Sequence, residues 1–240
     1  MVESGTSLIV ELLAALLTVV ALGIPLSLPV AVGVLVTPRQ QRRTAGPVIG
    51  GAFLVGLLLA VVVGLVGLAR LPTAVEVGSA LALVGGLVCT GIAAVLVLTR
   101  RADPGPAGPS GGAVLGVVGA ALIGLAEPLQ TLPAMFGLTR SAVVVFVAVV
   151  CEVVVILGLA GLLVMISRRF PGVRIGAAVG ALAAGLLTVP GVLSLGLHDV
   201  LGVHLPGVPI LLVLVGAVVA FVGGTLVGAR RSRSPVAPAP

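Results

Sequence analysis

Long apolar runs, separated by short segments with arginine, proline or small polar residues, make up most of this chain of 240 residues. Each run is at least as long as the roughly 20 residues with which an α-helix crosses the hydrocarbon core of a bilayer. The pattern predicts an all-α fold, a polytopic transmembrane helical bundle of about seven spans. The expected helices cover residues 8–36, 47–70, 76–99, 112–138, 141–167, 173–197 and 208–229.

Composition excludes a water-soluble protein. Hydrophobic residues make up 59% of the chain and charged residues 8%, with a mean hydropathy of +1.37, whereas about a quarter of the residues in a soluble domain are charged. Too few polar side chains are present to cover an aqueous surface. The net charge of +6 comes from arginines between the apolar runs, which is typical of topology signals and not of a nucleic-acid-binding surface.

The arginines predict the orientation. If the N-terminus lies outside, eleven of the 13 fall in cytoplasmic segments, and only Arg70 and Arg140 remain outside. Glu3, Glu76 and Asp199 also fall outside, as the positive-inside rule favours. We expect a multi-pass plasma-membrane protein with a cytoplasmic C-terminus. The cytoplasmic arginines are Arg39, Arg42, Arg43, Arg100, Arg101, Arg168, Arg169, Arg174, Arg230, Arg231 and Arg233.

A Pro/Gly-rich segment divides the chain into two similar halves. The segment LGIPLSLPVAVGVLVTPR can be laid beside IGLAEPLQTLPAMFGLTR, with Pro25 over Pro128. Because a repeat of three helices is odd, the second copy inserts upside down, as in many secondary transporters. The expected units are a first three-helix repeat (1–101), a cytoplasmic linker (102–112), an inverted second repeat (113–200), an extra C-terminal span (201–231) and a disordered tail (232–240).

Each repeat opens with a long helix that contains two prolines, Pro25 and Pro29 in the first and Pro128 and Pro133 in the second. Proline removes an amide donor and displaces a carbonyl, so these helices are expected to be interrupted near the middle of the bilayer. Unpaired backbone groups persist there only where protein or a water-filled cavity satisfies them. The symmetric placement favours a binding site, and the alternative is that the prolines only kink two helices for packing.

The segments IPLSLPVAVGVLVTPRQQRR and GPVIGGAFLVGLLLA resemble the GAP family of the lysine-exporter (LysE) superfamily, whose members are also described as peptidoglycolipid addressing proteins. The resemblance covers about residues 20–65 and implies export of a small metabolite or assistance to envelope glycolipid transport. The family tends to open its second half with Asn-Pro-Lys, whereas Glu127, Pro128 and Leu129 stand nearest that place here, and the seventh helix is additional. The matching positions are Pro25, Pro29, Thr37, Pro38, Arg39, Arg43, Phe53 and Gly56.

Three glutamates lie inside the apolar runs: Glu11, Glu127 and Glu152. An acid at the centre of a membrane helix costs about 2.5–3.5 kcal/mol, so such residues are functional candidates. Glu11 is close enough to the external end to reach water. The other two are each about 17 Å of helix from the turn that joins their helices, and like-charge repulsion with burial would leave one of them holding a proton.

We therefore predict a site in which Glu127 and Glu152, with Pro128, Gln130 and Thr131 beside them, bind a coupling proton or a cationic substrate group. Pro25 and Pro29 would complete it from the first repeat. The competing interpretation is that each glutamate is protonated and donates a hydrogen bond to a neighbouring carbonyl. Sequence alone leaves both open.

The remaining polar and small residues favour structural roles. Cys89 and Cys151 lie in apolar runs and are expected to pack. Two histidines and an aspartate in an external loop, His198, Asp199 and His204, do not have a diagnostic metal-binding spacing. Glycines at four-residue spacing predict close helix packing, within the chain or between protomers. These are Gly172, Gly176, Gly180, Gly224 and Gly228.

The sequence predicts a secondary transporter or exporter of a small molecule or envelope lipid precursor, working by alternating access with proton coupling as one option. No glycine-rich nucleotide loop or catalytic arrangement favours an enzyme, and no cofactor, metal or nucleic acid is expected. The partners are the lipid bilayer and an unknown substrate, with a homo-oligomer left open. The alternative is a non-transporting membrane subunit that assists envelope assembly through its glycine faces, for which a dry interior and lipid-facing glycine stripes would be the signature.

Overall fold

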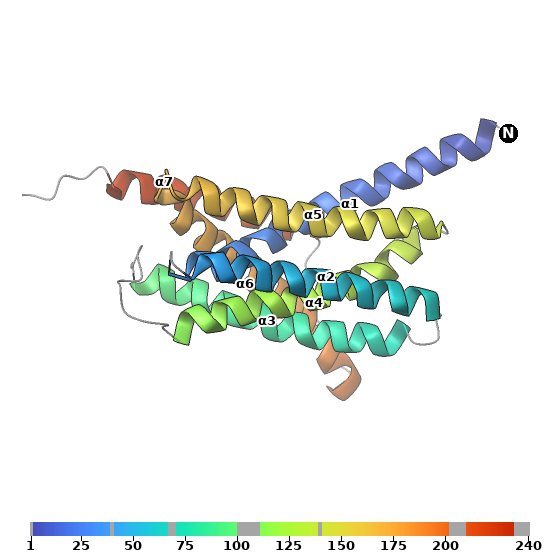
Figure 1. Cartoon of the computed structure of the whole chain (residues 1–240), viewed down its shortest axis with the longest axis horizontal. Helices are drawn as coiled ribbons and strands as arrows, with labels where there is room; N and C mark the ends of the chain where they lie inside the picture. Colours follow the sequence, from blue (N-terminus) through green and yellow to red (C-terminus); the bar gives the residue numbers. More distant parts are fainter. Residues whose placement is uncertain are drawn as a thin grey trace, which may run out of the picture.

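The computed structural model is a bundle of seven α-helices within the residues that it describes (Figure 1). Those residues are 2–38, 41–66, 71–99, 111–138, 141–201 and 210–232. No strand occurs among them, so the predicted all-α class is confirmed. The helices are α1 (Val2–Leu35), α2 (Arg42–Val66), α3 (Leu71–Thr99), α4 (Gly111–Leu138), α5 (Ala142–Ile166), α6 (Gly172–Leu201) and α7 (Ile210–Ser232).

The helix ends differ from the predicted ones. α2 begins at Arg42 instead of residue 47, and α6 continues to Leu201 instead of ending at residue 197. α4 begins at Gly111, so the last two residues of the expected linker are helical, and the rest of that linker lies outside the described residues. An apolar run marks the part of a helix inside hydrocarbon, whereas helical hydrogen bonds continue into the headgroup region, where polar residues are tolerated.

Lipid is the solvent that this bundle requires. Six of the helices are long and apolar enough to cross a membrane by length and composition, and α6 contributes a shorter apolar segment, Gly172–Thr188, within the described residues. Large apolar side chains point outward, and Leu17, Leu98 and Val143 are 72%, 79% and 71% exposed. A continuous apolar exterior is stable in a bilayer and not in water. The chain is a multi-pass membrane protein.

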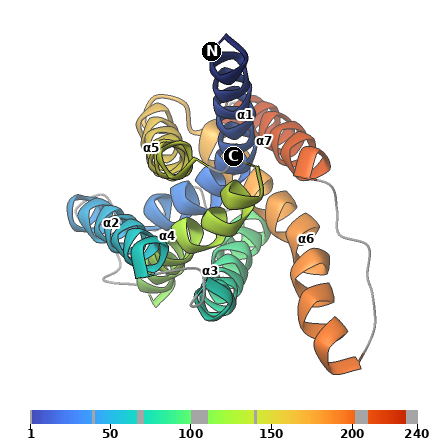
Figure 2. The ribbon, with the colours of Figure 1, turned by 90° about the vertical axis from the view of Figure 1, so that its right-hand side faces the viewer.

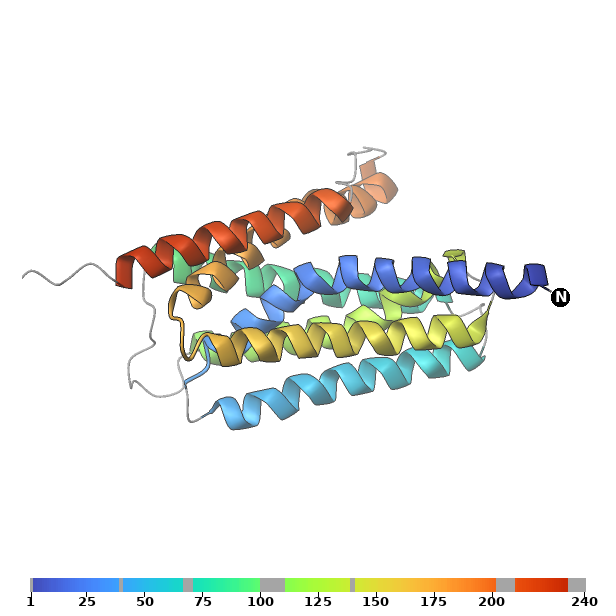
Figure 3. The same cartoon turned by 90° about the horizontal axis from the view of Figure 1, so that it is seen from above.

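The two halves of the chain interlock. α1 packs most extensively against α5, and α2 packs most extensively against α4, which also contacts α3 and α1. α7 lies along α6 on one side of the bundle, opposite α2 (Figure 3). The second half of α6 extends away from the other helices (Figure 2). α1 and α4 therefore lie at the centre, each against a helix of the other half.

The prolines do not end the helices that contain them, so the expectation of interrupted helices is wrong. α1 continues through Pro25 and Pro29, and α4 continues through Pro128 and Pro133. Neighbouring turns keep their hydrogen bonds and hold the helix together around the missing amide donors. α1 instead bends in its second half (Figure 3). We call residues 21–29 the proline segment of α1 and residues 124–133 the proline segment of α4.

Glycines allow the closest helix crossings. A Cβ atom added to Gly33 of α1 would lie 2.5 Å from the carbonyl oxygen of Gly116 of α4. On the α6–α7 contact, a Cβ on Gly172 would lie 2.7 Å from the Thr225 carbonyl oxygen. The other predicted packing glycines also face the partner helix within the chain, Gly176 and Gly180 towards α7 and Gly224 and Gly228 towards α6. These five glycines meet each other's helices and do not face lipid.

Candidate functional site

Two carboxyl groups are buried in the centre of the bundle, on α4 and α5. Glu127 is 5% exposed and Glu152 is 0% exposed. Each acts electrostatically on the other, and Thr131 lies beside the Glu152 carboxyl. The structure thus brings together the two glutamates and the threonine that the sequence placed in one site, and we call Glu127 and Glu152 the carboxyl pair.

Glu152 has no hydrogen-bond partner for either carboxyl oxygen within the described part of the chain. The Thr131 hydroxyl gives its one proton to the backbone carbonyl of Glu127 at 3.1 Å, so it does not donate to a charged Glu152 carboxylate. The competing interpretation requires Glu152 to donate to a neighbouring carbonyl, and it makes no such bond. A buried polar group without a partner loses about 1–3 kcal/mol of solvation, which makes Glu152 the anomaly of this site.

The environment of the carboxyl pair is apolar. One buried cluster contains Leu129 and Val149, and a second contains Ile123 and Val153, so the pair lies between them along α4 and α5. The arginines whose side chains the structure describes stand at helix ends, far from these mid-helix positions. Two unscreened negative charges in such surroundings repel strongly, so the arrangement favours binding of a proton or another cation.

The proline segment of α4 lies next to the pair. Pro128 has no amide hydrogen, so the Gly124 carbonyl loses its helical partner. That oxygen faces α2, where a Cβ added to Gly56 would lie 2.6 Å from it. The Phe53 ring occupies the space above Gly124, since a Cβ there would lie 2.6 Å from the ring. α2 therefore closes directly on the segment that carries Glu127.

The proline segment of α1 meets α5 in a similar way. Pro25 and Pro29 are both buried, and the Ser27 hydroxyl, whose residue is 2% exposed, donates to the Ile24 carbonyl at 2.7 Å. A Cβ added to Gly23 would lie 2.8 Å from Cγ1 of Val155. Because Val155 is less than one turn from Glu152, the proline segment of α1 contacts the part of α5 that carries Glu152.

Gln130 lies on the α3 side of α4. Its side chain is half-buried, and its Cγ is 3.6 Å from the position of a Cβ on Gly78. The side chain of Pro133 lies outside the described residues. The structure therefore brings Glu127, Glu152 and Thr131 together, with Pro128 next to Glu127 on α4 and Gln130 on the α3 side of the same helix. Pro25 and Pro29 are buried in α1, which packs against α5.

Sequence reasoning missed the glycines that close this region. Gly23, Gly78 and Gly124 received no role, and Gly56 was noted only through the family resemblance. A glycine two residues before Pro25 and another four residues before Pro128 were the available signal. Their role depends on which neighbouring helix faces them, which no single-helix pattern reveals.

The other candidate residues lie elsewhere or outside the described part of the chain. Cys89 is buried and Cys151 is half-buried, and both are free thiols packed among apolar residues. No group of three or more His, Cys, Asp or Glu suited to a metal occurs in the described residues. The side chains of His198 and Asp199, and the whole of His204, are not among them.

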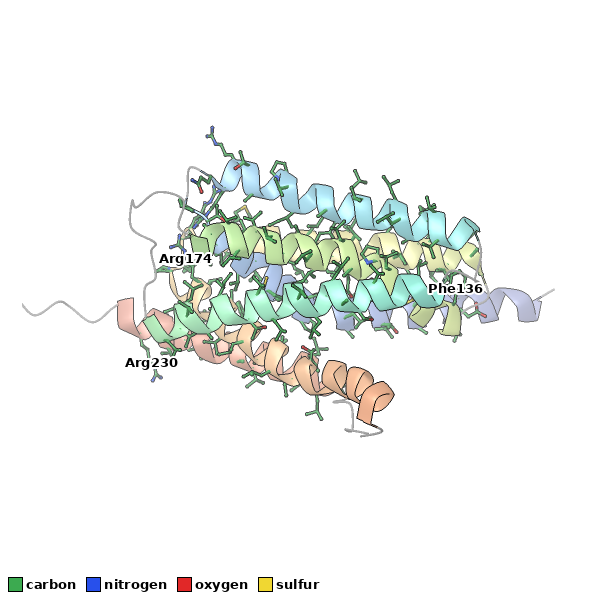
Figure 4. All side chains as sticks on the ribbon, turned by 90° about the horizontal axis from the view of Figure 1, so that it is seen from below. Phe136, Arg174 and Arg230 are labelled. Atoms are coloured by element: carbon green, nitrogen blue, oxygen red, sulfur yellow. The ribbon has the colours of Figure 1, made fainter. Side chains whose placement is uncertain are left out.

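The described arginines gather at one end of the bundle, which we call the arginine-rich end. Figure 4 shows Arg174 and Arg230 there and Phe136 at the opposite end. The carboxyl pair is separated from this end by the apolar cluster that contains Ile123 and Val153. Comparison of the chain with protein-family models, with curated proteins and with solved structures finds no match in any of the three.

Proposed function

We propose that this protein is a secondary transporter or exporter that works by alternating access, and that its carboxyl pair binds a coupling proton or a cationic substrate group. The observation that carries the proposal is the Glu152 carboxyl, which is fully buried without a hydrogen-bond partner among the described residues. An acid retained at such cost in a membrane helix is typical of ion and substrate pathways.

The electrostatics of the pair supports a cation. Two carboxylates in an apolar interior cannot both be charged without a counter-ion, because each loses its hydration and each repels the other. A proton shared by the pair, or a bound cation, removes that penalty. A structural role would instead be expected to satisfy the buried oxygens with hydrogen bonds, and Glu152 has none within the described residues.

The helix packing supports two inverted repeats. If α1, α2 and α3 correspond to α4, α5 and α6, then the α1–α5 contact corresponds to the α4–α2 contact. Both are among the most extensive contacts in the bundle, as expected when two inverted repeats interlock around a central site. α7 is outside this relation and covers α6. Rocking of one repeat against the other would then expose the carboxyl pair to each side in turn.

The cargo and the orientation are part of the same proposal. The resemblance to the GAP family favours a small metabolite or an envelope lipid precursor as cargo. The positive-inside rule puts the arginine-rich end in the cytoplasm, and hence the N-terminus outside the plasma membrane. The alternative, a non-transporting subunit that assists envelope assembly, would bind its partner through the predicted glycine faces. Those faces are instead occupied by the contact between α6 and α7.

Thiol labelling tests the proposal. In a chain with Cys89 and Cys151 replaced by alanine, Glu127→Cys is exposed to a membrane-impermeant thiol reagent from each side in turn. Ala177→Cys is the control, because Ala177 is also 0% exposed but lies in a cluster with α1 and α7 residues. We expect labelling of Glu127→Cys and none of Ala177→Cys, since alternating access opens only the central site.

Equal protection of both cysteines from both sides would contradict the proposal. It would mean that water never reaches the carboxyl pair, and it would favour the non-transporting envelope-assembly subunit. Labelling from one side only would support a pathway that opens in that direction and would assign the resting conformation.

A further inference from the structure

A tight turn joins α5 to α6 at the arginine-rich end. The amide of Ser167 donates to the Leu163 carbonyl at 2.9 Å, and the amides of Arg169 and Phe170 both donate to the Ile166 carbonyl at 2.9 Å. The Ser167 residue is 3% exposed, and its hydroxyl donates to the Val164 carbonyl at 2.7 Å. These bonds fix the backbone of the turn against the end of α5.

The tip of this turn projects from the bundle. Arg168, Arg169, Phe170 and Pro171 are all exposed, and Phe170 is 61% exposed. Two guanidinium groups and one aromatic ring thus leave the bundle from three consecutive positions. An exposed phenylalanine next to two arginines is unfavourable in water, but it suits a boundary where charge and apolar surface are both available.

The turn between α5 and α6 lies at such a boundary between polar and apolar surroundings. It joins α5, which is long and apolar enough to span a membrane, to α6, so the turn lies near the level of the lipid headgroups. Arg43 and Arg230 are also exposed at the arginine-rich end, while the acidic side chains that the structure describes, on Glu11, Glu127 and Glu152, lie elsewhere. The local potential is positive and attracts anionic headgroups.

We propose that Arg168, Arg169 and Phe170 form a binding site for an anionic phospholipid headgroup. The planar guanidinium groups donate paired hydrogen bonds to phosphate oxygens. The Phe170 ring enters the boundary between headgroups and acyl chains. Because the chain contains no tryptophan or tyrosine, which usually anchor helix ends at this level, Phe170 takes that place here. A free phosphate ion would use the arginines but not the ring.

Native mass spectrometry tests this site on the full chain released from vesicles of phosphatidylcholine and phosphatidylglycerol. The double variant R168Q/R169Q is expected to lower the ratio of retained phosphatidylglycerol to phosphatidylcholine on the order of tenfold. The control R43Q/R230Q removes the same charge from the same end and should change the ratio much less. F170S should also lower the ratio, and inorganic phosphate should not displace the lipid.

Three results would overturn the proposal. The first is the absence of any preference for phosphatidylglycerol in the unmodified chain, and the second is retention of that preference by R168Q/R169Q. The third is an equal loss of the preference in R43Q/R230Q, which would assign the effect to the overall positive charge of the arginine-rich end. Displacement by inorganic phosphate with no effect of F170S would reassign the site to a soluble anion. All substituted side chains are exposed at the bundle end, so each variant is expected to fold.

Discussion

Replacing Gly56 by alanine would place a methyl group between α2 and the proline segment of α4. The new carbon would lie 2.6 Å from the Gly124 carbonyl oxygen, 2.9 Å from the Leu125 carbonyl oxygen and 3.1 Å from the Leu125 Cα. All three are backbone atoms of a helix, so no side-chain rotation relieves the contact. α2 and α4 would have to separate, and overpacking of this kind costs about 1–3 kcal/mol.

The assay is the apparent midpoint of thermal unfolding in detergent or nanodiscs. We expect Gly56→Ala to lower the midpoint by roughly 3–10 °C. Gly51→Ala on the same helix is the matched control, because a Cβ there meets no atom within 4 Å. Alanine favours helix over glycine, so the control should be unchanged or slightly more stable. If Gly56→Ala were as stable as Gly51→Ala, the close approach of α2 to the proline segment would be refuted.

Three further predictions concern the carboxyl pair and the end of α1. Glu152→Leu should raise the unfolding midpoint, because it replaces an unpartnered buried carboxyl by an apolar side chain of similar volume. The expected gain in the free energy of unfolding is about 1–3 kcal/mol. A lower midpoint would show that the carboxyl has a stabilising partner. A hydrophobic carbodiimide reacts with protonated carboxyl groups, and peptide mass spectrometry measures the yield of modified Glu127 or Glu152. This yield should decline as pH rises, and modification should vanish in the double variant Glu127→Gln with Glu152→Gln. A pH-independent yield would contradict a titrating pair. Arg42→Gln should destabilise the chain by about 1.5–3 kcal/mol, because the Arg42 guanidinium donates to the Thr37 and Leu35 carbonyls at 2.9 and 3.0 Å. Arg43→Gln, at an exposed position, should be nearly neutral. Equal effects of the two variants in thermal unfolding would show that these two hydrogen bonds do not stabilise the end of α1.

The sequence was sufficient to predict that Glu127 and Glu152 belong to one site. Their distances from the shared turn were enough to place both acids at the same depth, because a helix advances a fixed rise per residue. The number of residues to the turn does not reveal which groups surround the two carboxyl groups. The structure shows that the Glu152 oxygens have no hydrogen-bond partner within the described residues, and that the nearby Thr131 hydroxyl donates to the backbone of its own helix.

The prolines show a limit of local rules. Each removes a hydrogen bond, and the sequence therefore predicted interrupted helices. In the bundle, α1 and α4 continue through them, because packing against α5 and α2 holds the turns on either side in helical geometry. Tertiary contacts outweigh the loss of single backbone bonds.

The order of residues along the chain is sufficient to predict a multi-pass helical membrane protein, the number of helices in its described part and the end at which its described arginines gather. Bilayer thickness sets helix length and apolar composition, and both can be read along a single chain. The packing of the whole bundle is needed to establish which helix faces touch, that the glycines of α6 meet α7, and that α2 approaches the proline segment of α4 at Gly56. In a membrane, lipid-facing and core-facing positions are alike apolar, so no amphipathic pattern marks the inner face.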